Sequence, residues 1–120
     1  MIMCLTKCFG FEAAHYLPDY DGPCSRLHGH SYKLQVTVSG TIDSVSGMII
    51  DFNILKKVVK ELIVDKYDHS YLNDYFELPT AENMVYDFFK VLDSKFSQMG
   101  IDVESVKLWE TESSYAECRR

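Results

Sequence analysis

The stretch "HGHSYKLQVTVSG", residues 28–40, alternates apolar and polar residues almost without a break. Successive side chains of a strand point to opposite faces of its sheet. The even-numbered residues from Tyr32 to Val38 would therefore form an apolar face, and the odd-numbered ones a polar face. This pattern predicts a long strand that buries one face only, which is typical of an antiparallel sheet.

Four other segments complete the expected secondary structure. Residues 4–15 alternate like a strand, and "MIID", residues 48–51, reads as a short apolar strand. Helical spacing predicts a helix over 52–66, with Asp51 as its N-cap, and a second helix from Thr80 to Gly100. Residues 102–112 read as a last strand. The order predicts a single α+β domain over residues 1–120, with a four-stranded antiparallel sheet and two helices on one face.

Charge and composition exclude several function classes. The chain has 120 residues and a formal net charge of −6, whereas a nucleic-acid binder normally presents a basic face. No run of about 18 apolar residues could span a bilayer, and the first residues do not resemble a signal peptide. The four cysteines form no CxxC pair. We therefore expect a cytoplasmic protein with free thiols, without nucleic-acid or membrane partners.

Three histidines and one cysteine are the candidate site. His28 and His30 would lie on the same face of their strand, and antiparallel pairing would bring His15 beside them. Three histidines with a free position are typical of catalytic zinc. Cys24 could be a fourth ligand, or a reacting thiol whose pKa the metal lowers. The alternative is that these are ordinary polar residues at the start of a strand.

Two further places carry acid or base groups. Asp68 and His69 are adjacent in a loop, and a histidine oriented by a carboxylate is a candidate general acid or base, although neighbours in sequence need not contact each other. Glu110 lies near the end of the last strand, where a carboxylate usually faces solvent.

Six short motifs together resemble one family, the 6-pyruvoyl-tetrahydropterin synthase superfamily. In chain order they are "FEAAHYLP", "CSRLHGHSY", "GMIIDF", "DHSYLN", "PTAEN" and "WET". The resemblance implies a tunnelling fold, in which the sheets of several subunits join into a barrel with the helices outside. A homo-oligomer, either a trimer or a hexamer, with sites at subunit interfaces would follow.

The motif in which three residues separate Cys24 from "HGH" is most similar to the branch that makes 6-carboxy-5,6,7,8-tetrahydropterin. This resemblance implies a zinc-dependent lyase that converts 7,8-dihydroneopterin triphosphate and releases acetaldehyde, in 7-deazaguanine and queuosine synthesis. The implied roles are zinc ligation by His15, His28 and His30, catalysis by Cys24, Asp68, His69 and Glu110, and pterin binding by Glu110, Thr80 and Glu82.

Two alternatives stay open. The same site could release 6-pyruvoyl-tetrahydropterin without cleaving the side chain, or the chain could be a non-catalytic oligomer that binds zinc or a pterin. Tyr67 and Ala81 depart from the family pattern, and the tail "SSYAECRR" fits it only loosely. These departures leave the substrate preference open but touch none of the implied ligands.

Overall fold

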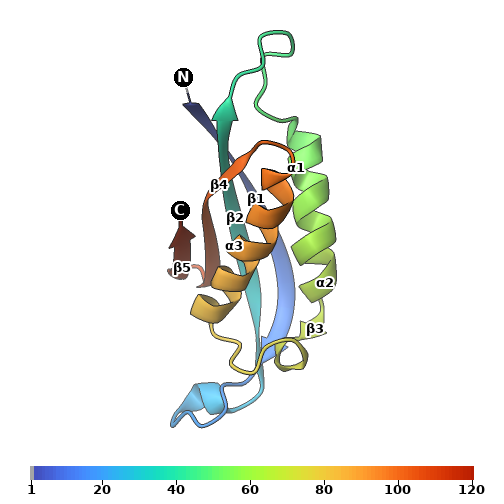
Figure 1. Ribbon diagram of the computed structural model, residues 1–120. Helices are drawn as coiled ribbons and strands as arrows, with labels where there is room; N and C mark the ends of the chain where they lie inside the picture. Colours follow the sequence, from blue (N-terminus) through green and yellow to red (C-terminus); the bar gives the residue numbers. More distant parts are fainter. Residues whose placement is uncertain (1) are drawn as a thin grey trace.

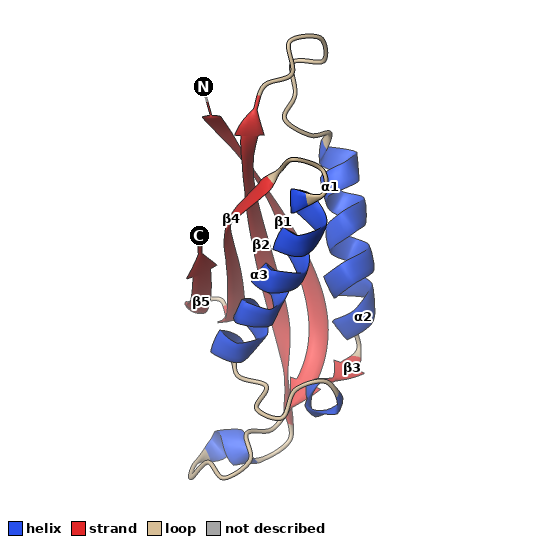
Figure 2. Ribbon diagram, viewed as in Figure 1, coloured by secondary structure: helices blue, strands red, loops and turns tan. Residues whose placement is uncertain are grey.

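The protein, described here by a computed structural model for residues 2–120, is built on one five-stranded sheet (Figures 1 and 2). The strand order is β3-β1-β2-β4-β5. All neighbouring strands are antiparallel except β3, which runs parallel to β1. The strands are β1 (Ile2–His15), β2 (His28–Thr41), β3 (Ser70–Tyr71), β4 (Asp102–Thr111) and β5 (Ser114–Arg119).

The expectation of a four-stranded, wholly antiparallel sheet is therefore wrong in two ways. Residues 48–51 form no strand, because the preceding loop closes on itself: Asp43 accepts hydrogen bonds from the backbone of Val45 and Ser46, and its own N–H donates to Met48. The tail after Glu112 instead forms β5, which pairs with β4 along its length. The two-residue β3 adds the parallel edge.

The two predicted helices are present and lie on one face of the sheet (Figure 2). The first runs through α1 (Phe52–Val59), a π-helical turn (Lys60–Val64) and α2 (Asp65–Tyr67), and the second is α3 (Ala81–Ser97). Both N-caps are as expected: the side chain of Asp51 accepts from the backbone N–H of Asn53, and that of Thr80 from Asn83. Single 3₁₀ turns cover Pro23–Ser25 and Leu72–Asp74.

The core lies between the helices and the apolar face of the sheet. The even-numbered side chains of β2 from Tyr32 to Val38 are buried there, as the alternation predicts, and α3 covers them with Phe88 and Phe96. The opposite face carries no helix, and Cys4, Cys8 and Lys33 are exposed on it. Among residues 2–120, no helix is both long and apolar enough to cross a membrane.

Strand register determines which side chains meet at one end of the sheet. β1 pairs with β2 so that His15 lies opposite His28 and Ala13 opposite His30. β2 pairs with β4 so that Lys33 lies opposite Trp109. Because side chains alternate between faces, Glu110 then points to the same face as the histidines. Three strands therefore deliver their polar side chains to one place beneath the start of α3.

Candidate metal centre

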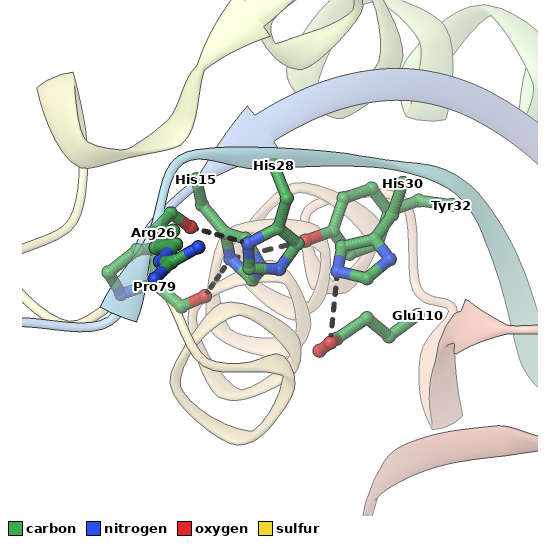
Figure 3. A network of polar contacts seen from close by, with 7 residues as sticks. All are labelled: His15, Arg26, His28, His30, Tyr32, Pro79 and Glu110. Carbon is green, nitrogen blue, oxygen red and sulfur yellow. Dashed lines mark hydrogen bonds and ion pairs between the residues drawn. The ribbon is translucent and has the colours of Figure 1, made fainter. Parts of the chain in front are cut away.

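Four side chains converge at this end of the sheet: His15, His28, His30 and Glu110 (Figure 3). Each offers one ligand atom, and these atoms all lie within 4.8 Å of one another. The Nε2 atoms of His15 and His28 are 3.1 Å apart, and the Nε2 atom of His30 is 3.1 Å from Oε1 of Glu110. The structure thus brings together the three predicted ligands and adds a carboxylate.

Backbone carbonyls hold two of the imidazoles in orientation. His15 donates from Nδ1 to the carbonyl of Pro79 over 2.8 Å, and His28 donates from Nδ1 to the carbonyl of Arg26 over 2.7 Å. In a neutral imidazole, a proton on Nδ1 leaves Nε2 as a lone pair. Such outer partners are the usual way in which a protein aims a histidine at a metal. Both Nε2 lone pairs therefore point into the cluster.

The donor set fits a divalent cation. Two Nε2 lone pairs 3.1 Å apart repel each other unless a cation or proton lies between them. The Nε2 atom of His30 is buried and makes no hydrogen bond to any described residue, because the Glu110 oxygen beside it is not in line for one. Imidazole nitrogens and a carboxylate oxygen are ligands that zinc uses. A metal would satisfy all four groups at once.

Burial keeps two of these imidazoles neutral. It lowers the pKa of His15 and of His30 below the ordinary value of 6.5, although the nearby Glu110 carboxylate partly opposes this shift. Neutral imidazole is the form that binds metal. The two side chains are therefore ready to act as ligands at neutral pH.

The same burial predicts how the metal-free protein responds to acid. Below about pH 6.5 the unfolded chain takes up protons on His15 and His30 that the folded chain resists, so stability falls as the pH decreases. Thermal unfolding of metal-free wild type and of His15→Gln at pH 7.5 and 5.5 tests this. We expect the wild type to lose stability relative to the variant at pH 5.5. An identical loss in both proteins would contradict the prediction.

Asp68 and His69 form a pair on the edge of the sheet. His69 Nδ1 lies 3.0 Å from Oδ1 of Asp68, and the same oxygen accepts a 2.9 Å hydrogen bond from the backbone of Glu12. That backbone N–H lowers the pKa of the Asp68 carboxyl. His69 has a positive φ of 58°, which its backbone hydrogen bond to the Glu12 carbonyl helps to hold. The two adjacent side chains therefore contact each other, and the backbone holds both in place.

The imidazole of His69 is exposed and does not belong to the four-residue cluster. Its side chain is 79% accessible, and it borders an open cavity of about 420 Å³ that Glu12, His30 and Ser31 also line. Ser31 donates to the Glu12 carboxylate over 2.6 Å on this wall. Because Glu12 and Ser31 point to the face without helices and His30 points to the other face, His69 borders a cavity on the face opposite to the histidine cluster.

Cys24 lies in the loop between β1 and β2, where its carbonyl accepts a 2.7 Å hydrogen bond from Leu17. Its thiol is half-buried and is not one of the four converging groups. The idea that Cys24 completes the metal's ligands is therefore not supported in this chain. Glu110 is the fourth converging group instead, although the family resemblance implied a catalytic and pterin-binding role for it and no place among the metal ligands.

Two of the three predicted pterin residues border a second cavity, of about 560 Å³, beside the cluster. Glu110 lines it from β4 and Glu82 from the first turn of α3. Thr80 caps the same helix, directly after the Pro79 carbonyl that holds His15. β5 supplies a wall that sequence reasoning missed, because the tail gave no clear strand signal. The lining residues are Ala81, Glu82, Glu110, Thr111, Ser114, Tyr115, Ala116 and Glu117.

The fold and the site define an α+β domain with a candidate metal centre at one end of its sheet, beside an open cavity. The sequence model of the family described as 6-pyruvoyl tetrahydropterin synthase matches residues 4–120, so the chain belongs to this family. The resemblance seen in the six motifs is thereby confirmed.

Two similar curated proteins are both named 6-carboxy-5,6,7,8-tetrahydropterin synthase. The one from Synechocystis is 40% identical over 119 residues, which cover 93% of this chain and 89% of the relative. The one from Haemophilus influenzae is 34% identical over 137 residues, covering 94% and 96%. The similarity therefore extends over nearly the whole length of each protein.

Solved structures share the fold. The 6-pyruvoyl tetrahydropterin synthase of Caenorhabditis elegans superposes with a TM-score of 0.87 at 28% identity, covering 100% of this chain and 96% of its own. The Plasmodium vivax 6-pyruvoyltetrahydropterin synthase gives a TM-score of 0.75 at 21% identity, covering 100% and 98%. At that lower identity, the match supports the fold alone.

Proposed function

We propose that this protein is a zinc-dependent 6-carboxy-5,6,7,8-tetrahydropterin synthase. It converts 7,8-dihydroneopterin triphosphate to 6-carboxy-5,6,7,8-tetrahydropterin, releasing acetaldehyde and triphosphate, and so serves 7-deazaguanine and queuosine synthesis in the cytoplasm. The observation that carries the proposal is the cluster of three histidines. It occurs in a chain that is similar, over nearly its full length, to relatives with that name.

In this proposal His15, His28 and His30 hold the zinc, with the Pro79 and Arg26 carbonyls fixing the ring orientations of His15 and His28. Zinc supplies Lewis acidity, which lowers the pKa of a substrate hydroxyl and steadies developing negative charge. A substrate in the cavity that Glu82 and Glu110 line would lie beside the zinc, because Glu110 belongs to the cluster as well.

Cys24 acts as the thiolate base that removes a proton from the substrate side chain. Asp68 and His69 handle a second proton: the carboxylate accepts from Nδ1 of His69 and so orients the ring, leaving Nε2 to exchange the proton with substrate. The pair resembles other histidine–carboxylate catalysts in that the carboxylate sets the tautomer while the imidazole does the transfer.

Glu110 recognises the pterin in this proposal. A single carboxylate can accept two parallel N–H bonds from the amino-pyrimidine edge, which fixes the ring in its plane. Glu82 lines the cavity at the start of α3, and Thr80 caps that helix next to it. The cavity of about 560 Å³ is within the range that small-molecule sites occupy.

We also propose that the active site is completed by a second copy of the chain, within a trimer or hexamer. Two observations support this. The thiol of Cys24 and the exposed imidazole of His69 both lie outside the metal cluster of a single chain. In addition, one sheet face carries no helix. A monomer is then expected to be inactive.

The test of the proposed function is the product. Zinc-loaded protein is incubated with 7,8-dihydroneopterin triphosphate, and the products are identified by mass spectrometry. Carboxytetrahydropterin together with acetaldehyde supports the proposal. Pyruvoyl-tetrahydropterin would favour the second candidate function, a 6-pyruvoyl-tetrahydropterin synthase. The structural similarity to the Caenorhabditis elegans enzyme supports this candidate. Unchanged substrate would leave a non-catalytic zinc-binding or pterin-binding protein.

A further inference from the structure

Glu110 lies where two sites meet. Its carboxylate belongs to the metal cluster, with Oε1 3.1 Å from Nε2 of His30, and it also lines the cavity beside the cluster. The carboxylate is largely buried, with 27% of its side chain accessible. A metal in the cluster and a ligand in the cavity would therefore compete for the same two carboxylate oxygens.

The distance between Glu110 and His30 is that expected of two ligands of one metal ion. The His30 nitrogen makes no hydrogen bond to the described residues, so the short distance to Oε1 is not explained by an N–H donor. In tetrahedral zinc sites the metal lies about 2.0–2.2 Å from nitrogen and oxygen ligands, which places neighbouring ligand atoms about 3.3 Å apart. The 3.1 Å separations of both pairs in the cluster are close to that spacing.

A carboxylate on the metal cannot at the same time receive the pterin edge with both oxygens. We propose that Glu110 is an exchangeable fourth metal ligand, which closes the site in the pterin-free enzyme and leaves the metal when a pterin binds in the adjacent cavity. Recognition of the ring would thereby open the metal position that the substrate side chain needs. This inference rests on the proposed function for the identity of the ligand that displaces Glu110.

Cobalt(II) makes the exchange visible, because its visible absorption reports the number and type of ligands. The first experiment compares the cobalt-loaded wild type with Glu110→Gln, without pterin, by absorption and by competition with a chromophoric chelator. We expect a changed spectrum and an affinity at least about tenfold lower in the variant, since even outer partners of ligands contribute 10–100-fold. Glu112→Gln, which removes an exposed carboxylate two residues away, is the matched control and should match the wild type.

The second experiment adds unsubstituted pterin, which has no side chain to react, to the cobalt-loaded wild type. We expect the spectrum to change as the pterin binds, and the spectrum of Glu110→Gln to stay as it was. A wild-type spectrum and affinity in pterin-free Glu110→Gln would overturn the assignment of Glu110 as a ligand.

Bound pterin with no spectral change in the wild type would overturn the exchange while leaving the proposed reaction intact. Conversely, if Glu110→Gln changes the cobalt spectrum but the zinc-loaded wild type yields no product, Glu110 is still a metal ligand and the proposed function is wrong. The wild-type titration requires no substitution, so a poorly folded variant would not prevent the test.

Discussion

Replacing His28 with alanine is expected to abolish stable zinc binding and, with it, all turnover. The substitution removes one of three nitrogen ligands, and we expect zinc affinity to fall by at least about 100-fold. That is the upper end of the loss seen when only a hydrogen-bond partner of a ligand is removed. His28 is the best choice because its side chain is less buried than that of His15, so the change leaves no deep cavity in the fold. Metal content after dialysis and chelator competition measure the effect.

The matched control is His69→Ala, which removes the chain's only histidine outside the cluster. It should keep full zinc content while losing turnover, since its proposed role is proton transfer. A His28→Ala protein that retains one zinc per chain with wild-type affinity would show that the metal is held elsewhere. Circular dichroism of both variants ensures that loss of metal is not loss of fold.

Replacing Cys24 with alanine is expected to lower turnover by about 10²- to 10⁴-fold, the range that general acid–base groups contribute. Zinc content should be unchanged, because the thiol lies outside the converging ligands. Cys8→Ala is the control: this exposed thiol sits on the sheet face without helices, and its loss should leave turnover as it was.

Two results would contradict this assignment. Loss of zinc from Cys24→Ala would mean that the thiol is a ligand of a closed, structural site, which favours the binding-protein alternative. Retention of wild-type turnover would mean that another group removes the proton. Product identification under single-turnover conditions, together with metal analysis, separates these outcomes.

Local sequence patterns were enough for the main elements. The alternation in residues 28–40 predicted β2 and its buried face, and helical spacing with capping residues at Asp51 and Thr80 predicted where both helices begin. These signals are short-range: they depend on side-chain period and on a cap a few residues away. The spacing of His28 and His30 likewise placed both on one face.

Other features depend on residues far apart in the chain. The two-residue β3 exists only because Ser70 and Tyr71 pair with β1, and β5 because the tail meets β4 and Arg120 hydrogen-bonds to the Val103 and Glu104 carbonyls. Conversely, "MIID" has the apolar composition of a strand but lies in a loop, which the hydrogen bond from the Asp43 N–H to the Met48 carbonyl closes.

The sequence by itself determined the amphipathic strands, the capped helices and the three histidines as candidate ligands, because period and spacing act locally. Only the tertiary structure decided that Glu110, rather than Cys24, joins those histidines, and that the Pro79 and Arg26 carbonyls aim two of them. The physical reason for Glu110 and Pro79 is long-range contact: the pairing of β2 with β4 and the hydrogen bond from His15 on β1 to Pro79 join groups far apart in sequence. The Arg26 carbonyl is only two residues from His28, and its role depends on the local loop conformation.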